Sequence, residues 1–276
     1  MKVADEFVIA PPGRFSLNLR ELWQYRELFY FFTWRDVKVK YKQTVLGIVW
    51  AILQPLLMML IFTFFFGRPL HIETLGIPYP LFVFSGLVLW NLFSTGITNA
   101  GNSMVTNSNI IKKIYFPRLI IPVSSILSSL LDFCFAFLVL IGLLIWYRQP
   151  VNYVLMLLYW PLGVFLTCLA TFGPGCWLAA LNIKYRDFRY VIPFIVQALL
   201  FVTPVIYPVT ALQNKWMQLL LSLNPMYAAI EIFRAPIVGG VTHPTSVGIS
   251  ILSGIILFFI GLLYFKKTEI YFADLA

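Results

Sequence analysis

Charge is scarce in this chain of 276 residues: only 11% are Asp, Glu, Lys or Arg, whereas 60% are hydrophobic. The mean hydropathy is +0.85. A soluble domain needs a largely polar and charged surface, so this composition excludes an ordinary soluble protein. Several apolar tracts reach the roughly 20 residues that a helix needs to cross a hydrocarbon core of about 30 Å. They lack the alternating ten-residue pattern of a membrane β-barrel, so the sequence predicts an all-α integral membrane protein.

Groups that carry chemistry are also rare. The sequence contains no G-x-x-x-x-G-K-[ST] motif, so it has no P-loop to bind ATP phosphates. Asp132 is the one acidic residue well inside an apolar tract, and His71 and His243 both fall between tracts. Ion-coupled carriers and intramembrane enzymes need several such groups together. We therefore expect no catalytic residue, metal site or cofactor in this chain. This indicates a transport path whose energy is supplied by another protein.

The three cysteines, Cys134, Cys168 and Cys176, all lie within apolar tracts. Their spacing matches neither a metal-ligand set nor a disulfide framework. We interpret them as small core residues.

Six apolar tracts predict six transmembrane helices. Their expected ranges are Gly47–Phe66, Pro80–Ala100, Leu119–Trp146, Tyr153–Leu181, Val191–Tyr207 and Val247–Tyr264. Residues 1–46 would then form a cytoplasmic N-terminal segment, residues 47–265 the six-span transmembrane domain, and residues 266–276 a cytoplasmic tail.

The net charge of +9 is distributed unevenly along the chain. If the N-terminus is cytoplasmic, sixteen of the twenty Lys and Arg residues lie in cytoplasmic segments. Cytoplasmic loops of membrane proteins carry such an excess. The distribution therefore predicts an orientation with both termini in the cytoplasm. It also explains the positive charge without a nucleic-acid partner.

The segment before the first span predicts an amphipathic helix at the membrane interface, over Leu17–Phe32. Leu19, Leu22, Trp23 and Phe29 share one broad helical face, and polar residues occupy the other. This division of faces is typical of helices that lie in the interface plane.

Two tracts predict irregular helices. Pro161 and the triplet Gly173-Pro174-Gly175 predict a kink or break in the fourth span. Residues 208–246 contain four prolines and two glycines, yet they are too apolar for a solvated loop. Re-entrant or interfacial helices on the outer face fit this stretch best, provided that other protein buries their backbone groups.

Five motifs occur in order along the chain. They are the run from Arg35 to Trp50 followed by Leu53-Gln54-Pro55, Asn109-Ile110-Ile111-Lys112-Lys113 with Phe116-Pro117-Arg118, the run from Asn182 to Phe188, Thr203-Pro204-Val205-Ile206-Tyr207, and Leu223-Asn224-Pro225. From about residue 17 to its end, the chain resembles the permeases of ATP-binding-cassette exporters that move O-antigen, capsule or teichoic-acid polymers.

The resemblance implies a homodimer of six-span subunits in the lipids of the cytoplasmic (inner) membrane, which forms one channel for a lipid-linked polysaccharide. It also implies two separate nucleotide-binding ATPase subunits, which would hold ATP and Mg²⁺. This chain would then be the permease subunit and not itself an enzyme. The residues leave open a permease for a small solute, drug or lipid, an ion channel, and a membrane assembly protein without a transport function.

By the same resemblance, the loops at 101–118 and 182–190 would couple the permease to its ATPase. The candidate coupling residues are Lys112, Lys113, Tyr185, Arg186, Asp187 and Phe188. The last three combine both signs of charge with an aromatic ring, as protein contacts often do. The alternative interpretation is a pair of solvated turns whose lysines set the membrane topology.

Two spans carry the candidate channel-lining residues. They are Trp50 and Gln54 in the first span, and Tyr190, Phe194, Gln197 and Phe201 in the fifth. Each set shares one helical face, and an unpaired amide in lipid is costly. Aromatic rings and sparse amides suit a sliding sugar chain; the alternative is ordinary packing or an interfacial aromatic belt.

Asp132 lies one helical turn from Ser128 and Ser129 and two turns from Ser125. Such a polar stripe is typical of helix–helix packing, with the serines donating to the carboxylate. We favour this interpretation, and proton coupling is the alternative.

Overall fold

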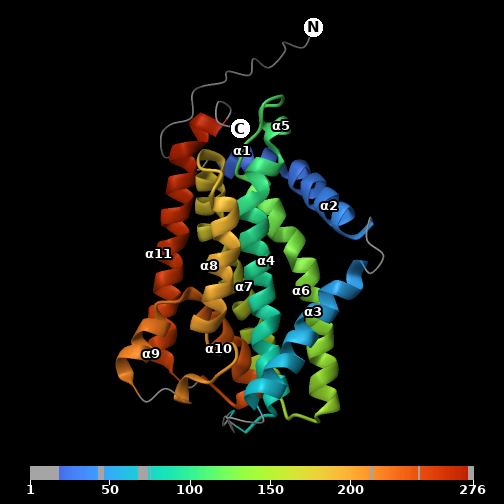
Figure 1. The fold of residues 1–276 in the computed structure, drawn as a ribbon, viewed down its shortest axis with the longest axis vertical. Coiled ribbons are helices and arrows are strands. Elements are labelled where there is room, and N and C mark those ends of the chain that lie inside the picture. The colour runs from blue at the N-terminus through green and yellow to red at the C-terminus, as the bar shows by residue number, and fades with distance from the viewer. Residues whose placement is uncertain are drawn as a thin grey trace.

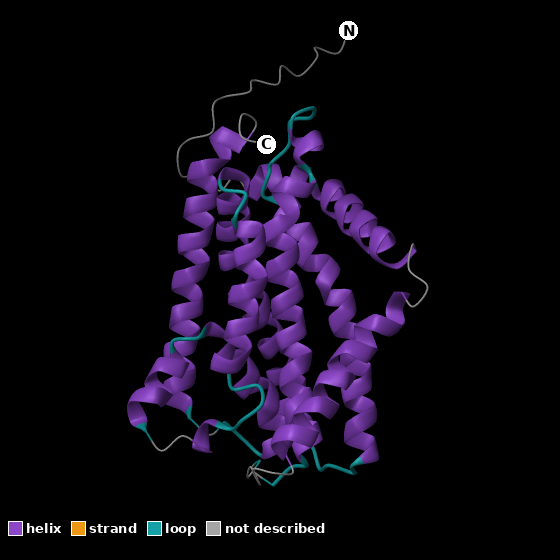
Figure 2. Ribbon diagram, in the orientation of Figure 1, coloured by secondary structure: helices purple, strands orange, loops and turns teal. Residues whose placement is uncertain are grey.

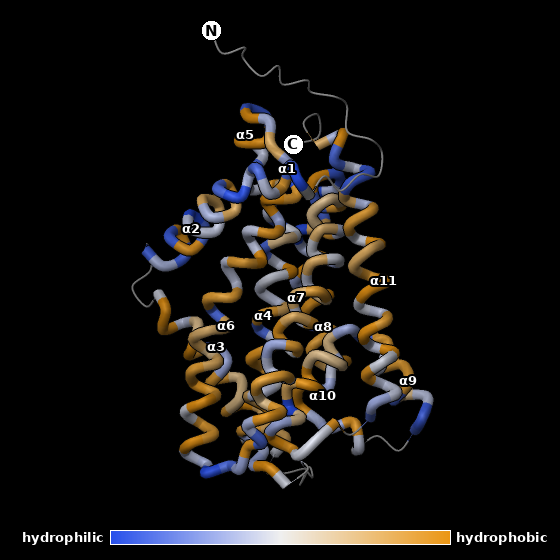
Figure 3. The backbone as a smooth tube through the Cα atoms, turned by 180° about the vertical axis from the view of Figure 1, so that it is seen from behind, coloured by the Kyte–Doolittle hydropathy of each residue, from blue (hydrophilic) through white to orange (hydrophobic). Residues whose placement is uncertain are grey.

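The computed structural model describes residues 19–42, 47–67, 74, 76–211, 214–241 and 243–272. Over these residues the regular secondary structure is helical, and the loops lie mostly at the two ends of a long bundle (Figure 2). In Figure 1, α1, α5 and the C-terminal end of α11 lie at one end, which we call the upper end. The opposite end, near α9, is called the lower end. Hydrophilic segments gather at both ends of the bundle (Figure 3).

The bundle is built from eleven described α-helices. They are α1 (Leu19–Gln24), α2 (Arg26–Lys42), α3 (Gly47–Phe62), α4 (Tyr79–Thr106), α5 (Ser108–Ile111), α6 (Ile120–Trp146), α7 (Tyr153–Lys184), α8 (Phe188–Val202), α9 (Lys215–Ser222), α10 (Pro225–Val238) and α11 (Pro244–Thr268). Short turns of other helix types follow α3 (η1, Thr63–Gly67), precede α9 (η2, Val209–Ala211) and follow α11 (η3, Glu269–Tyr271).

Five helical segments of the described chain are long and apolar enough to cross a membrane. They are Gly47–Gly67, Tyr79–Thr106, Ile120–Trp146, Tyr153–Lys184 and Pro244–Tyr271. The first four and the last predicted spans are thereby confirmed as long apolar helices. The fifth, Val191–Tyr207, is shorter than predicted, because α8 ends at Val202. Thr203 precedes Pro204 and has an extended backbone, since the residue before a proline avoids the helical conformation.

α4 is the central helix of the bundle. It contacts α6, α7, α8, α10 and α3 (Figure 1), and the residues from Leu81 to Trp90 are all buried. A large hydrophobic core surrounds this part of α4, and a second core near the upper end contains Phe32, Phe116 and Phe265.

Of the two alternatives predicted for the fourth span, the break is wrong, because α7 runs continuously from Tyr153 to Lys184, and the kink stays a prediction. Its glycines instead allow a close approach to α11. A Cβ atom built on Gly261 would lie 1.9 Å from the Gly173 carbonyl oxygen, and one built on Gly173 would lie 2.4 Å from the Phe258 Cα. Small residues at such a crossing let two helix backbones touch.

The stretch predicted to be re-entrant contains two helices, α9 and α10, near the lower end (Figure 1). Asn214 caps α9 and Asn224 caps α10, each through its side-chain oxygen. The Asn224 amide also donates to the Thr203 hydroxyl at 2.7 Å, and the Ser253 hydroxyl of α11 donates to the Leu223 carbonyl at 2.7 Å. The turn between α9 and α10 is thus held between the end of α8 and α11.

The amphipathic helix predicted over Leu17–Phe32 differs from the observed elements, although residues 17 and 18 lie outside the described part. A turn at Tyr25 separates α1 from α2, and α2 continues to Lys42. In Figure 1, α2 slants down the side of the bundle and α3 follows below it. Both helices contact α6. Trp23, assigned to the apolar face, is 70% exposed.

Candidate functional site

A polar stripe runs along the middle of α4. Asn91, Ser94, Thr95, Thr98 and Asn99 follow one another at intervals that place them on one helical face. They line a cleft of about 370 Å³ together with Gln54 of α3 and Gln197 of α8. Trp90, Met58 and Val196 are among the apolar residues of its wall. α3, α4 and α8 therefore line one open cleft whose described residues combine amides and hydroxyls with apolar side chains and carry no charge.

The hydroxyl groups of the stripe donate to the backbone of their own helix. Ser94 donates to the Asn91 carbonyl at 3.3 Å, and Thr98 donates to the Ser94 carbonyl at 2.7 Å. Thr95 also donates to the Asn91 carbonyl. Since each hydroxyl oxygen has two acceptor lone pairs, these groups still offer acceptors to the cleft.

The amides of the cleft differ in how they are satisfied. The Asn99 amide donates to the Ser129 hydroxyl of α6 at 3.2 Å. Within the described residues, the side chains of Gln54, Asn91 and Gln197 have no hydrogen-bond partner. Three amides therefore direct unused donors and acceptors into or beside the same cleft.

The predicted channel-lining residues divide into two groups. Gln54 and Gln197, from separate spans, meet at the cleft. Trp50, Tyr190, Phe194 and Phe201 lie outside it, each at least half exposed on the surface of this single chain. Ile192, Val196 and Leu200 form the buried side of α8.

The α4 stripe was not among the residues predicted from the sequence. The signal was present, because Asn91 to Asn99 repeat at helical spacing within an apolar tract. Amides in the first and fifth spans stood out as isolated polar residues. The small hydroxyl groups of the second span are easily interpreted as local backbone-bonded residues, which is how they bond here.

The predicted coupling residues lie at the upper end, in two separate loops. Lys112 and Lys113 follow α5 and are exposed. Tyr185, Arg186 and Asp187, which join α7 to α8, are also exposed, and Phe188 is partly buried. The rings of Tyr185 and Phe188 lie 6.4 Å apart, and the Lys184 ammonium lies 5.0 Å from the Tyr185 ring centroid. The α7–α8 loop thus presents a compact group of rings and charges.

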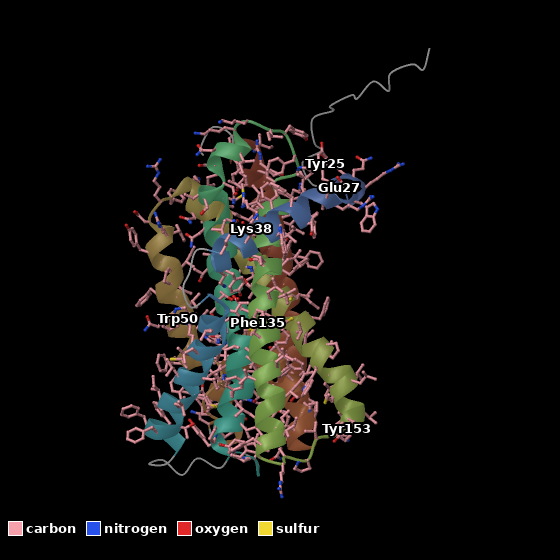
Figure 4. The ribbon with its side chains drawn as sticks, turned by 90° about the vertical axis from the view of Figure 1, so that its right-hand side faces the viewer. Tyr25, Glu27, Lys38, Trp50, Phe135 and Tyr153 are labelled. Atoms are coloured by element: carbon pink, nitrogen blue, oxygen red, sulfur yellow. The ribbon has the colours of Figure 1, made fainter. Side chains whose placement is uncertain are left out.

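Asp132 joins α6 to α2. Its carboxylate accepts hydrogen bonds from the Lys40 ammonium and the Tyr41 hydroxyl, and the Lys40 contact is also an ion pair. Burial and the adjacent Asp132 raise the pKa of the Tyr41 hydroxyl, which stays protonated as a donor. Figure 4 shows Lys38 on α2 above Phe135 of α6, with Trp50 of α3 to one side.

The predicted donation from the nearby serines to Asp132 is wrong. Ser128 and Ser129 donate to the Ser125 carbonyl, at 2.8 and 3.3 Å. Ser125 itself donates to the Asp36 carboxylate of α2 at 3.4 Å. Ser128 and Ser129 lie on the turn of α6 before Asp132. Their hydroxyls bond to the backbone carbonyl of Ser125 instead, because serine hydroxyls in helices commonly donate to the carbonyl three or four residues earlier.

Arg234 holds α10 against the lower half of the bundle. Its buried guanidinium donates to the carbonyls of Phe82, Pro204 and Val205 at 2.6–2.9 Å and to the Ser85 hydroxyl at 3.2 Å. It also lies 3.7 Å from the Phe82 ring centroid. Arg234 thus connects α10 to the start of α4 and to the segment that follows α8.

Comparison with known proteins matches residues 27–238 to the family described as ABC-2 type transporter. The chain is 30% identical to the O-antigen export system permease protein RfbA of Klebsiella pneumoniae, over 90% of this chain and 95% of that protein. It is 30% identical to RfbA of Myxococcus xanthus over 79% and 82%. It is 24% identical to the polysialic acid transport protein KpsM of Escherichia coli over 85% and 91%.

Proposed function

Because this chain belongs to the ABC-2 type transporter family, we propose that it is the membrane-spanning permease subunit of an ATP-driven exporter of a lipid-linked polysaccharide. The similarity to export permeases over nine-tenths of the chain is the observation that carries this proposal. Those relatives are named for O-antigen and for polysialic acid, both of which are sugar polymers.

The energy source in this proposal is a separate ATPase. The sequence has no P-loop, so ATP and Mg²⁺ would be held by two nucleotide-binding subunits. They would dock at the upper end, against the residues Lys112, Lys113, Tyr185, Arg186, Asp187 and Phe188. The exposure of both loops supports this position. A push on the loop between α7 and α8 would move two helices that both border α4.

The substrate path in this proposal lies at a homodimer interface. The exposed rings of Trp50, Tyr190, Phe194 and Phe201 would face it, with Gln54 and Gln197 beside them. Aromatic faces and sparse amides offer a sugar chain weak, repeated contacts, which permit sliding.

The proposed membrane arrangement has six crossings and both termini in the cytoplasm of the inner membrane. The short helix α8 spans about 22 Å at 1.5 Å per residue, less than the hydrocarbon core of about 30 Å. The re-entrant pair α9 and α10, whose linking turn contacts the end of α8, would complete this crossing. The upper end would be cytoplasmic, because the predicted inside-positive loops lie there.

Deletion of this gene in the source organism tests the proposal. We expect the surface polysaccharide to disappear and lipid-linked polymer to accumulate inside the cell, with both effects reversed by the wild-type gene. The readout is polymer quantified separately in surface extracts and in spheroplasts. Unchanged surface polymer in the deletion strain would refute the function.

A further inference from the structure

We propose that the cleft on α4 is a glycan subsite that selects uncharged sugar units. This inference rests on the proposed export function and adds a substrate class and a set of contact residues to it. The residues that carry it are Asn91, Thr95, Gln54 and Gln197.

The first argument is the state of the amides. Gln54, Asn91 and Gln197 lie near the middle of their helices and have no hydrogen-bond partner within the described residues. Gln54 and Gln197 are exposed on this single chain and Asn91 is half-buried, so in a bundle that crosses a bilayer they would face lipid unless a polar partner covers them. A polar group in lipid without a partner is costly, so such groups are normally paired with protein, water or ligand. Three unused amides around one cleft indicate that a polar occupant belongs there.

The second argument is the kind of hydrogen bonding that the cleft offers. Each amide side chain both donates and accepts, whereas the hydroxyls of Ser94, Thr95 and Thr98 use their protons on the α4 backbone and keep acceptor lone pairs. Sugar hydroxyls also donate and accept. They complement this mixture, while the apolar side chains of Met58 and Val196 can contact the C–H groups of a sugar ring.

The third argument concerns charge. None of the thirteen described residues that line the cleft is ionisable. An anionic sugar brought to this depth would lose its hydration without gaining a cation. A cleft of about 370 Å³ also lies within the range of about 300–1,000 Å³ that ligand sites occupy.

Binding of two oligosaccharide probes to the full chain in lipid nanodiscs tests the proposal. The probes are maltoheptaose, which is neutral, and an oligosialic acid of similar length, both carrying the same uncharged fluorophore. We expect the neutral probe to bind at least tenfold more tightly by fluorescence anisotropy. Asn91→Ala and Gln197→Ala should each weaken it by about threefold to tenfold, the value of one hydrogen bond. Gln24→Ala, outside the cleft, is the matched control.

A gain of affinity gives an independent check. Thr95→Lys should raise the affinity for oligosialic acid by at least fivefold, whereas Thr106→Lys, on the same helix but outside the cleft, should not. Size-exclusion profiles verify that each variant is folded. Equal or tighter binding of the anionic probe to the wild type, no binding of maltoheptaose, or no effect of the Asn91 and Gln197 variants would overturn the inference. Loss of surface polymer in the deletion strain would leave the export function standing in all three cases.

Discussion

At the scale of single residues, Asp132 shows how a charge is accommodated inside an apolar helix. A carboxylate at this depth is costly unless it is paired. The chain supplies both a cation and a hydroxyl from α2, so the carboxylate ties the N-terminal helix to α6. This arrangement assigns Asp132 to helix attachment, in agreement with the packing interpretation, but through partners that lie more than 90 residues away.

A double-mutant cycle on Lys40→Met and Asp132→Asn should reveal this attachment. Each single change removes the same ion pair, so the two effects should couple by about 0.5–3 kcal/mol. The measurement is thermal unfolding in detergent, and a loss of a few degrees is expected for Asp132→Asn alone. Asp187→Asn, at an exposed carboxylate, is the control. Strictly additive effects would show that the pair does not stabilise the chain.

Gly261 provides a second test at this scale. Gly261→Ala should destabilise the protein by about 1–3 kcal/mol or more, because the new methyl group would overlap the Gly173 carbonyl and force α7 from α11. Gly248→Ala is matched to it on the same helix, where a Cβ meets no atom within 4 Å. That change should be neutral or stabilising, since alanine favours the helix. Equal stability of the two variants in thermal unfolding would disprove the close contact.

At the scale of elements, α8 has one face that packs on the bundle and one face that is exposed. One face packs on the bundle through Ile192, Val196 and Leu200, and the other exposes Tyr190, Phe194 and Phe201. Both lipid and a sliding sugar chain can cover exposed rings of this kind. A functional comparison of exposed rings on different helices is therefore needed.

Phe194→Ala combined with Phe201→Ala should slow polymer export several-fold and leave the amount of folded protein unchanged, because the path would lose two sugar-contacting rings. Phe165→Ala with Phe259→Ala removes two similarly exposed rings from α7 and α11 and should export normally. Pulse labelling of surface polymer measures the rate. The same rate of polymer export in both double mutants would show that the α8 rings face lipid and not the substrate path.

The loop between α7 and α8 is the second element with a testable role. Asp187→Ala with Phe188→Ala should reduce copurification of the ATPase or uncouple ATP hydrolysis from export, since a docked charge would lose its partner. Lys215→Ala with Trp216→Ala alters a matched charge and ring at the lower end and should retain the ATPase. Normal ATPase binding and normal export in the first double mutant would exclude this loop as the coupling element.

At the scale of the whole molecule, the inside-positive charge distribution predicts which end faces the cytoplasm. In a chain with Cys134, Cys168 and Cys176 changed to Ala, new cysteines at Gln149 and Lys215 should react with a membrane-impermeant maleimide in intact cells. Cysteines at Lys113 and Asp187 should react only after the cells are opened. Labelling of Lys215→Cys only in opened cells would rule out six crossings.

The fold class was predictable because bilayer crossing imposes a local rule on composition and length. Each long apolar tract had to be a helix, since an isolated strand leaves its backbone groups unpaired in lipid. The error in α7 came from interpreting Gly173-Pro174-Gly175 as a backbone signal alone. Gly173 is required because α11 packs against it too closely for a side chain. The local sequence of α7 does not predict where α11 lies.

Sequence by itself determined the membrane class, the approximate helix ranges, the absence of a P-loop and, through ordered motifs, the transporter resemblance. These properties depend on residues close together in the chain. Only the tertiary structure decided that Gln54, Gln197 and the stripe on α4 share one cleft, and that Asp132 binds α2. Such meetings depend on how helices pack, which is governed by side-chain shape and polar pairing over the whole bundle and not by the periodicity of any one segment.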